Sequence, residues 1–130
     1  EGSIRDNLVF GNKAVNDDVI FEALKIVGLS SFLKEQRNGL QTILNPEGKQ
    51  MSYTISKKII LARAIIKQPK IMILEDPLDQ FNLEETLEII NYLTDSKRPW
   101  SLIVTSSKKS WKSKCSQIIT LEKGKIKSIN

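Results

Sequence analysis

Two adjacent carboxylates at the end of an apolar run are the side chains of this sequence best suited to chemistry. Glu75 and Asp76 directly follow Ile71-Met72-Ile73-Leu74 and precede Pro77. A pair of acids in such a place can hold a metal ion or polarise a water molecule. Two interpretations stay open at this point: a pair that binds metal and activates water, and a solvated strand end whose two acids happen to be adjacent.

Other common catalytic side chains are scarce. The sequence has no His and a single Cys, Cys115. Zinc chemistry and nucleophilic catalysis by a Ser–His or Cys–His pair are therefore excluded. One cysteine also rules out an internal disulfide and fits a reducing compartment. The acid pair is left as the main chemical feature.

The elements around the acids predict two parallel strands. Residues 70–74 and 101–105 are short apolar runs rich in β-branched side chains, which is typical of buried strands. A helix lies between them in sequence, and a strand–helix–strand unit makes a parallel pair. Ligands of such sheets bind beyond the carboxyl ends of the strands. We therefore expect Glu75, Asp76 and Ser106 to face one site.

The helix between the two strands should start at Asn82. Glu85 follows three residues later, which fits a capping box. Helical spacing predicts an apolar face made of Leu83, Leu87, Ile90 and Leu93.

The rest of the chain reads as helices followed by a hairpin. In the first part of the chain we expect a short turn over residues 4–9 capped by Ser3, a helix from Asn16 that Gly28 ends, and a short helix over residues 31–36. A long helix should run from Ser52 to residue 68. The chain should end in a hairpin of residues 116–121 and 125–129. The long helix carries so many apolar residues that we expect it to be buried on most sides.

The amino-acid composition limits the classes of protein to which this chain can belong. The chain has 130 residues, of which 40% are hydrophobic and 27% charged, so it is globular. It has no apolar run of the ~20 residues that span a bilayer, and no signal peptide is expected. The net charge of +5 lies largely in Lys57-Lys58 and in residues 108–114. Charge runs of this kind are usually solvated, and the few aromatic residues are not interleaved with them, so no nucleic-acid surface is indicated.

A resemblance to a known family lies in the central segment, LQTILNPEGKQMSYTISKKIILARAIIKQPKIMILEDPLDQFN. It looks like the second half of the ATP-binding cassette of ABC transporters. That family has a loop ending in Gly and Gln, a Leu-Ser-Gly-Gly-Gln signature, an Ala-Arg-Ala helix and a strand ending in Asp-Glu-Pro. Here the matching parts are Gly48 and Gln50, Met51 to Ile55, Ala62-Arg63-Ala64 and Glu75-Asp76-Pro77.

The resemblance covers nearly the whole chain. The opening GSIRDNLVFG and the closing QIITLEKGKI are similar to the corresponding segments of exporter-type cassettes. Residues Thr42 to Gly48 stand where exporters carry a loop that touches the membrane domains.

The resemblance implies ATP and Mg²⁺ as cofactors and a role for each matching residue. Glu75 stands in the metal position and Asp76 in the position that polarises the attacking water. Ser106 replaces the switch histidine. The signature residues Ser52, Tyr53 and Thr54 would bind nucleotide, as would Asn82, which replaces the Asp of a Leu-Asp pair. Ser52 and Asn82 also fit ordinary helix caps.

Several of these positions depart from the family pattern. The two acids are exchanged in order, Tyr53 and Thr54 replace glycines, and no Gly-x-x-x-x-Gly-Lys-Ser/Thr phosphate loop is present. The chain therefore reads as a piece that begins after that loop. Catalysis is expected to be weak or degenerate.

The sequence thus predicts an α/β protein with a partial P-loop NTPase-like fold. It divides into a helical signature subdomain at residues 1–51 and the signature helix, short parallel sheet and closing β-hairpin at residues 52–130. The implied function is coupling of ATP binding and hydrolysis to export. The implied partners are a membrane-spanning domain and a second cassette at the cytoplasmic face of the membrane.

Two alternatives remain beside an ATP-driven transport component. One is a non-catalytic regulatory or interaction module that kept the fold. The other is a cassette acting on nucleic acid, suggested by the charge alone. The transported substrate is not indicated, because membrane segments would select it.

Overall fold

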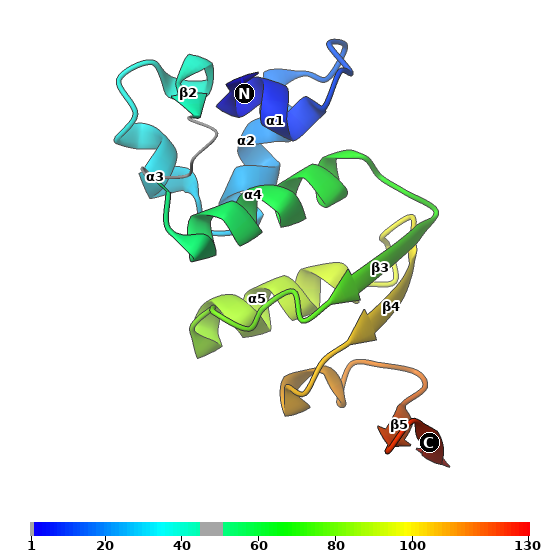
Figure 1. Ribbon diagram of the computed structural model, residues 1–130. Helices are drawn as coiled ribbons and strands as arrows, with labels where there is room; N and C mark the ends of the chain where they lie inside the picture. The colour runs from blue at the N-terminus through cyan, green and yellow to red at the C-terminus, as the bar shows by residue number, and fades with distance from the viewer. Residues whose placement is uncertain (1, 45–50) are drawn as a thin grey trace.

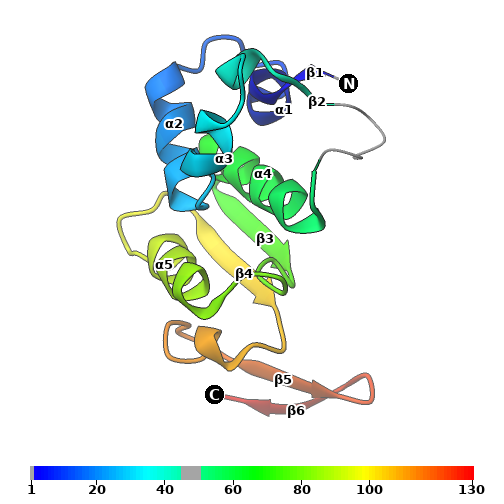
Figure 2. The same cartoon turned by 90° about the vertical axis from the view of Figure 1, so that its left-hand side faces the viewer.

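The computed structural model describes residues 2–44 and 51–130. It is a mixed α/β structure with three parts, a helical group, a two-stranded parallel sheet carrying one helix, and a C-terminal hairpin (Figure 1). No helix of these residues is long and apolar enough to cross a bilayer. The helical group lies at one end of the molecule and the hairpin at the other (Figure 2).

The helical group comes from the first part of the chain. Its elements are β1 (Gly2–Ser3), α1 (Ile4–Val9), α2 (Asp17–Ile26), α3 (Ser30–Lys34), the 3-10 turn η1 (Gly39–Gln41) and β2 (Ile43–Leu44). The predicted caps are confirmed: the Ser3 side chain caps α1 and the Asn16 side chain caps α2. The antiparallel pairing of β1 with β2 was not predicted, because strands of two residues carry no periodicity.

Helix α4 (Tyr53–Ile66) joins the helical group to the sheet. It begins as predicted, since the Ser52 Oγ accepts a hydrogen bond from the Ile55 N–H at 3.2 Å. It packs against α1 and α2, and the Arg63 Nε donates to the Asn7 carbonyl at 2.7 Å. The expectation that α4 is buried on most sides is confirmed, because Tyr53 and Ile60 are the only exposed residues of this helix and the others are buried or partly buried.

The parallel sheet has the predicted strands. β3 (Ile71–Glu75) pairs with β4 (Ser101–Thr105) in a register that runs from Ile71 opposite Ser101 to Glu75 opposite Thr105. Both strands therefore end at the same rim. This confirms the predicted strand–helix–strand unit.

Helix α5 (Leu83–Leu93) lies along one face of this sheet, as both views show (Figures 1 and 2). Its buried residues are Thr86, Ile89, Ile90 and Leu93. The predicted apolar face was wrong for Leu83 and Leu87, which are exposed. Spacings of three and four residues fit both the predicted apolar face and the face that is buried in the structure. Only packing against the sheet selects the face that contains Thr86.

The chain ends in a short 3-10 turn and a hairpin. η2 (Lys109–Trp111) precedes β5 (Ile119–Glu122) and β6 (Lys125–Ile129). The hairpin turns at Lys123 and Gly124, which have φ of 50° and 74°. Trp100 and Trp111 are buried and pack in the core. The division of the chain at residue 51 remains a prediction.

Candidate functional site

Glu75 and Asp76 end β3 at the rim where β4 also ends. The Asp76 N–H donates to the Thr105 carbonyl at 2.9 Å, which extends the ladder by one bond. Ser106 follows directly in the chain, so the three residues predicted to share a site do lie at one rim. Asp76 has a φ of 36°, in the left-handed region. This conformation turns the chain away from the sheet immediately after the acid pair.

A lysine from the first turns of α4 holds the loop after the acids. The Lys57 Nζ donates to the Asp76 carbonyl at 3.1 Å and pairs with the Asp79 Oδ1 at 3.1 Å. Burial acts to lower the pKa of Lys57, but the bonds to Asp79 and Tyr53 outweigh it, so the pKa is raised. The same Lys57 hydrogen bond lowers the pKa of Asp79. Helix α4 is thereby tied to the rim.

The neighbouring lysine is buried. Lys58 is 7% exposed and its ammonium pairs with the Glu85 carboxylate from α5. The Lys58 Nζ also lies 5.3 Å from the Phe81 ring centroid. The expectation that this charge run is solvated is therefore wrong for Lys58, which is buried, and both lysines already have internal partners.

Ser52 and Asn82 cap the helices that follow them, as the sequence predicts. The Asn82 Oδ1 accepts from the Glu85 N–H at 2.9 Å, so Asn82 caps α5. Only this half of the predicted capping box forms, because the Glu85 side chain reaches Lys58 instead. At α4 the Ser52 oxygen accepts the capping bond, which leaves its hydroxyl proton able to donate.

The other signature-like residues surround this helix start. Tyr53 is 59% exposed, and its ring centroid lies 5.4 Å from the Lys57 Nζ. Thr54 is partly buried. At the rim, the Ser106 Oγ accepts from the Lys108 N–H at 3.1 Å in an exposed loop. Gly48, Gln50 and the loop from residue 45 to 48 lie outside the described residues.

Comparisons with known proteins point to one family. No protein-family model matches the sequence. The chain is 27% identical over 128 residues to ABC transporter B family member 1 of Dictyostelium discoideum, covering 98% of this chain and 14% of that protein. It is 28% identical over 124 residues to the alpha-hemolysin translocation ATP-binding protein HlyB of Escherichia coli, covering 95% and 18%. A putative export ATP-binding/permease protein of Rickettsia felis is 30% identical over 99 residues, covering 74% and 17%.

The fold agrees with these relatives. A solved bacterial Atm1-family ABC exporter with ATP bound matches with a TM-score of 0.83 over 98% of this chain and 22% of that one, at 16% identity. The chain is a homologue of the exporter-type ABC cassette. It spans between 14% and 22% of the length of these relatives.

The donors of this cassette homologue fit magnesium only in part. Within the described ranges, no group of three or more His, Cys, Asp or Glu side chains could hold a metal ion. Glu75 and Asp76 supply two carboxylates at the rim. Magnesium in proteins is often held by one or two carboxylates together with substrate phosphates. The two carboxylates at this rim could therefore contribute ligands to Mg²⁺ as part of a nucleotide complex, but they do not form a metal site by themselves.

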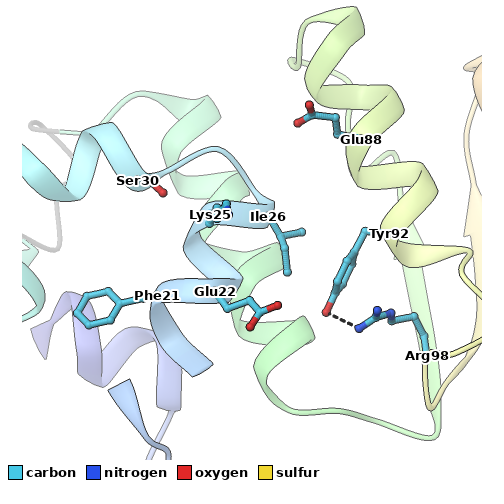
Figure 3. Close-up of a pocket in the computed structure, with 8 residues that line it drawn as sticks. All are labelled: Phe21, Glu22, Lys25, Ile26, Ser30, Glu88, Tyr92 and Arg98. Atoms are coloured by element: carbon cyan, nitrogen blue, oxygen red, sulfur yellow. Dashed lines mark hydrogen bonds between the residues drawn. The ribbon is translucent and has the colours of Figure 1, made fainter. Parts of the chain in front are cut away.

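The cassette homologue also carries a hollow that the sequence did not indicate. It has a volume of about 800 Å³ and lies between α2 and α5 (Figure 3). Its lining residues are Phe21, Glu22, Lys25, Ile26, Ser30, Glu88, Tyr92 and Arg98. The Arg98 guanidinium donates to the Tyr92 hydroxyl at 3.1 Å, before the start of β4. The hollow thus borders the amino ends of the strands and is separate from the acidic rim.

Sequence reasoning missed the residues that brace the site. Lys57, Asp79 and the pair Lys58–Glu85 join segments about 20 to 30 positions apart. The available signal was the presence of two adjacent lysines on α4 and acids on both sides of Asn82. Nothing in that spacing identifies which lysine meets which acid.

Proposed function

We propose that this chain is the signature-side part of an exporter-type cassette, which couples ATP binding to transport and hydrolyses ATP weakly. The arrangement that carries the proposal is the shared rim: Glu75, Asp76 and Ser106 meet at the carboxyl ends of two parallel strands. The same rim is tied by Lys57 to the helix that begins at Ser52. The exporter relatives support the same reading.

Each residue has a proposed role in nucleotide binding. The Ser52 hydroxyl donates to the terminal phosphate of a nucleotide held by a second cassette, with Tyr53 and Thr54 beside it. Glu75 holds Mg²⁺, which supplies positive charge against the phosphates when bound. Asp76 polarises water, Ser106 occupies the switch position, and Asn82 contributes to the cofactor-binding loop in addition to capping α5.

The geometry of the side chains explains why hydrolysis should be weak. Glu75 is one methylene longer than the Asp of the family, and Asp76 is one methylene shorter than the Glu. A displacement of a catalytic group by ~1 Å can lower the rate ~100-fold. Ser106 has no imidazole, and loss of one charge-stabilising donor costs about 3 kcal/mol in other enzymes.

The proposed partners follow from the same family. They are a membrane-spanning domain, in the same or another chain, and a second cassette that completes the nucleotide sandwich. The site of action is the cytoplasmic face of the membrane. No nucleic-acid partner is proposed, and the transported substrate would be selected by the membrane-spanning domain.

The test exchanges the two acids. ATP turnover is measured for the full-length protein in membranes, as wild type and with Glu75→Asp and Asp76→Glu made together. We expect a low wild-type rate of ATP turnover and an increase of at least ~10-fold in the exchanged variant, because each carboxylate then has the side-chain length that the family has at its position. The matched control exchanges acids on α2, Asp18→Glu with Glu22→Asp, and should leave the rate unchanged. Ordinary turnover in wild type, unaffected by the exchange at the rim, would contradict the proposal.

A non-catalytic module is the second candidate. The observation that favours it is the exposed Tyr53 ring at the start of α4, where the family places glycines that let a phosphate approach. Equilibrium binding of ATP to the full-length protein separates the two candidates. No measurable ATP binding, in wild type and in Tyr53→Gly alike, would support the non-catalytic module and reject the ATP-driven one.

A further inference from the structure

Asp76 has an unfavourable backbone conformation. Its φ of 36° lies in the left-handed region, where residues other than glycine are uncommon. Pro77 follows it, and a residue before proline normally has an extended backbone. A strained conformation of this kind persists only when the surrounding structure fixes it. The contacts of the Asp76 backbone are therefore the contacts that decide where its carboxylate lies.

Both polar groups of the Asp76 backbone are bonded. The N–H donates to the Thr105 carbonyl on β4 at 2.9 Å. The carbonyl accepts from the Lys57 Nζ at 3.1 Å. The first bond belongs to the sheet, whereas the second comes from one side chain of α4. Lys57 is thus the side chain that completes the support of this conformation.

Lys57 has a defined position of its own. Its Nζ lies 3.1 Å from the Asp79 Oδ1, so one ammonium bridges Asp76 and a residue three positions further along the loop after β3. It also lies 5.4 Å from the centroid of the Tyr53 ring, one helical turn earlier on α4. The Lys57 side chain is 23% exposed. A side chain held by several contacts at once is suited to fixing the position of another group.

The Asp76 carboxylate depends on this support. Asp76 is exposed, so packing does not fix its side chain, and the backbone torsion sets the direction of its Cα–Cβ bond. Relaxation of φ to the ordinary negative region would turn that bond relative to the rim. Displacement of a catalytic group by ~1 Å can lower a rate ~100-fold. Loss of the Lys57 contact would therefore matter even though Lys57 touches no reacting atom.

We infer that Lys57 is a positioning residue for Asp76. Its ammonium holds the Asp76 carbonyl, and thereby the left-handed backbone that aims the carboxylate at the attacking water. The inference rests on the proposed function for the role of Asp76, whereas the hold on the backbone rests on the distances alone. Because Lys57 belongs to the helix that begins at Ser52, one side chain also joins the two halves of the proposed nucleotide site within this chain.

Hydrogen exchange in the full-length protein tests the hold on the backbone. In Lys57→Met the Asp76 amide should exchange at least ~10-fold faster than in wild type, because its bond to Thr105 opens more often. Lys57→Arg should stay within ~3-fold of wild type, since a guanidinium can also donate to a carbonyl and a carboxylate. The amide of Met72, which is buried in the middle of β3, should not change. An unchanged Asp76 amide in Lys57→Met overturns the inference. Equal acceleration at Met72 also overturns it, because Lys57 would then stabilise the whole sheet.

ATP turnover tests the consequence for catalysis. Lys57→Met and Lys57→Arg are added to the full-length protein with the acids exchanged, Glu75→Asp with Asp76→Glu, where turnover is expected to be higher. Lys57→Met should lower kcat at least ~10-fold and change KM by less than ~2-fold, and Lys57→Arg should retain most of kcat. Lys127→Met is the matched control, because it removes a lysine that forms an exposed ion pair in the hairpin. It should leave both constants unchanged.

The two measurements separate this inference from the proposed function. Faster exchange at Asp76 in Lys57→Met with an unchanged kcat overturns the positioning role, as does a loss of kcat that is equal in Lys57→Arg. Absence of ATP turnover in every variant, including the exchanged acids alone, rejects the proposed function. The Asp76 amide then still decides whether Lys57 holds this backbone.

Discussion

The Lys58 ammonium and the Glu85 carboxylate form an ion pair that joins α4 to α5, and the Lys58 Nζ lies over the Phe81 ring. Lys58 is almost fully buried, and Glu85 is partly so. Gly28, at the end of α2, approaches the same two groups. Helices α4 and α5 and the end of α2 therefore meet at one charged contact, beside Phe81 of the loop that follows the acidic rim.

Removing one partner of this pair should destabilise the protein. Lys58→Met leaves the Glu85 carboxylate partly buried without its cation, so we expect a loss of about 2 to 4 kcal/mol in the free energy of unfolding. Lys58→Met with Glu85→Leu removes both charges and should recover most of the loss. Urea denaturation of the three proteins measures the effect.

The exposed ion pair of the hairpin is the control for this experiment. The Lys127 Nζ lies 3.0 Å from the Glu122 Oε2, and both side chains are more than half exposed. Lys127→Met should leave the unfolding free energy unchanged, because exposed pairs contribute little. If Lys58→Met were equally harmless, the buried pair would have no structural role.

Gly28 should resist substitution because of its neighbours as well as its backbone. A Cβ at this position would lie 3.1 Å from the Glu85 Oε1 and 3.4 Å from the Lys58 Nζ, and its φ is 71°. We expect Gly28→Ala to cost about 1 to 3 kcal/mol of stability. Gly124 has nearly the same φ, 74°, with no atom within 4 Å of a Cβ. Gly124→Ala should therefore cost less, and equal losses in the two variants would show that the contact with the ion pair is unimportant.

The Lys57–Asp79 pair predicts a dependence of stability on pH. The pKa of Asp79 is lowered from its ordinary 3.8, so its contribution is present above that value and is lost as pH falls through the lowered pKa. The pKa of Lys57 is raised from 10.5, so its contribution is present below that value and is lost as pH rises through the raised pKa. The Lys57–Asp79 ion pair is therefore intact across the neutral pH range.

Asp79→Asn tests this pH dependence. Thermal midpoints of wild type and variant should differ near neutral pH and converge as the pH falls well below 3.8, where Asp79 is protonated in both folded and unfolded chains. The exposed Glu88 on α5 provides the control, as Glu88→Gln should follow wild type. A difference between Asp79→Asn and wild type that stayed constant down to low pH would mean that the ion pair is not its cause.

Local features of the fold could be predicted because they depend on residues close in sequence. Ser3, Asn16, Ser52 and Asn82 cap helices through bonds that span two or three residues. The two β-branched runs became β3 and β4, and the helix between them required a parallel pairing. The shared rim of Glu75, Asp76 and Ser106 follows directly from that topology.

The sequence by itself thus determined the helix starts, the strands and the order of motifs that carries the resemblance to ABC cassettes. Only the tertiary structure decided which face of α5 is buried, since the predicted face with Leu83 and Leu87 and the buried face with Thr86 and Ile89 overlap, share Ile90 and Leu93, and have the same helical spacing. It also decided that Lys57 meets Asp79 and Lys58 meets Glu85, and that Ile60 and Ile73 remain exposed. These outcomes depend on how distant segments approach one another, and a periodic pattern along the chain contains no information on that approach.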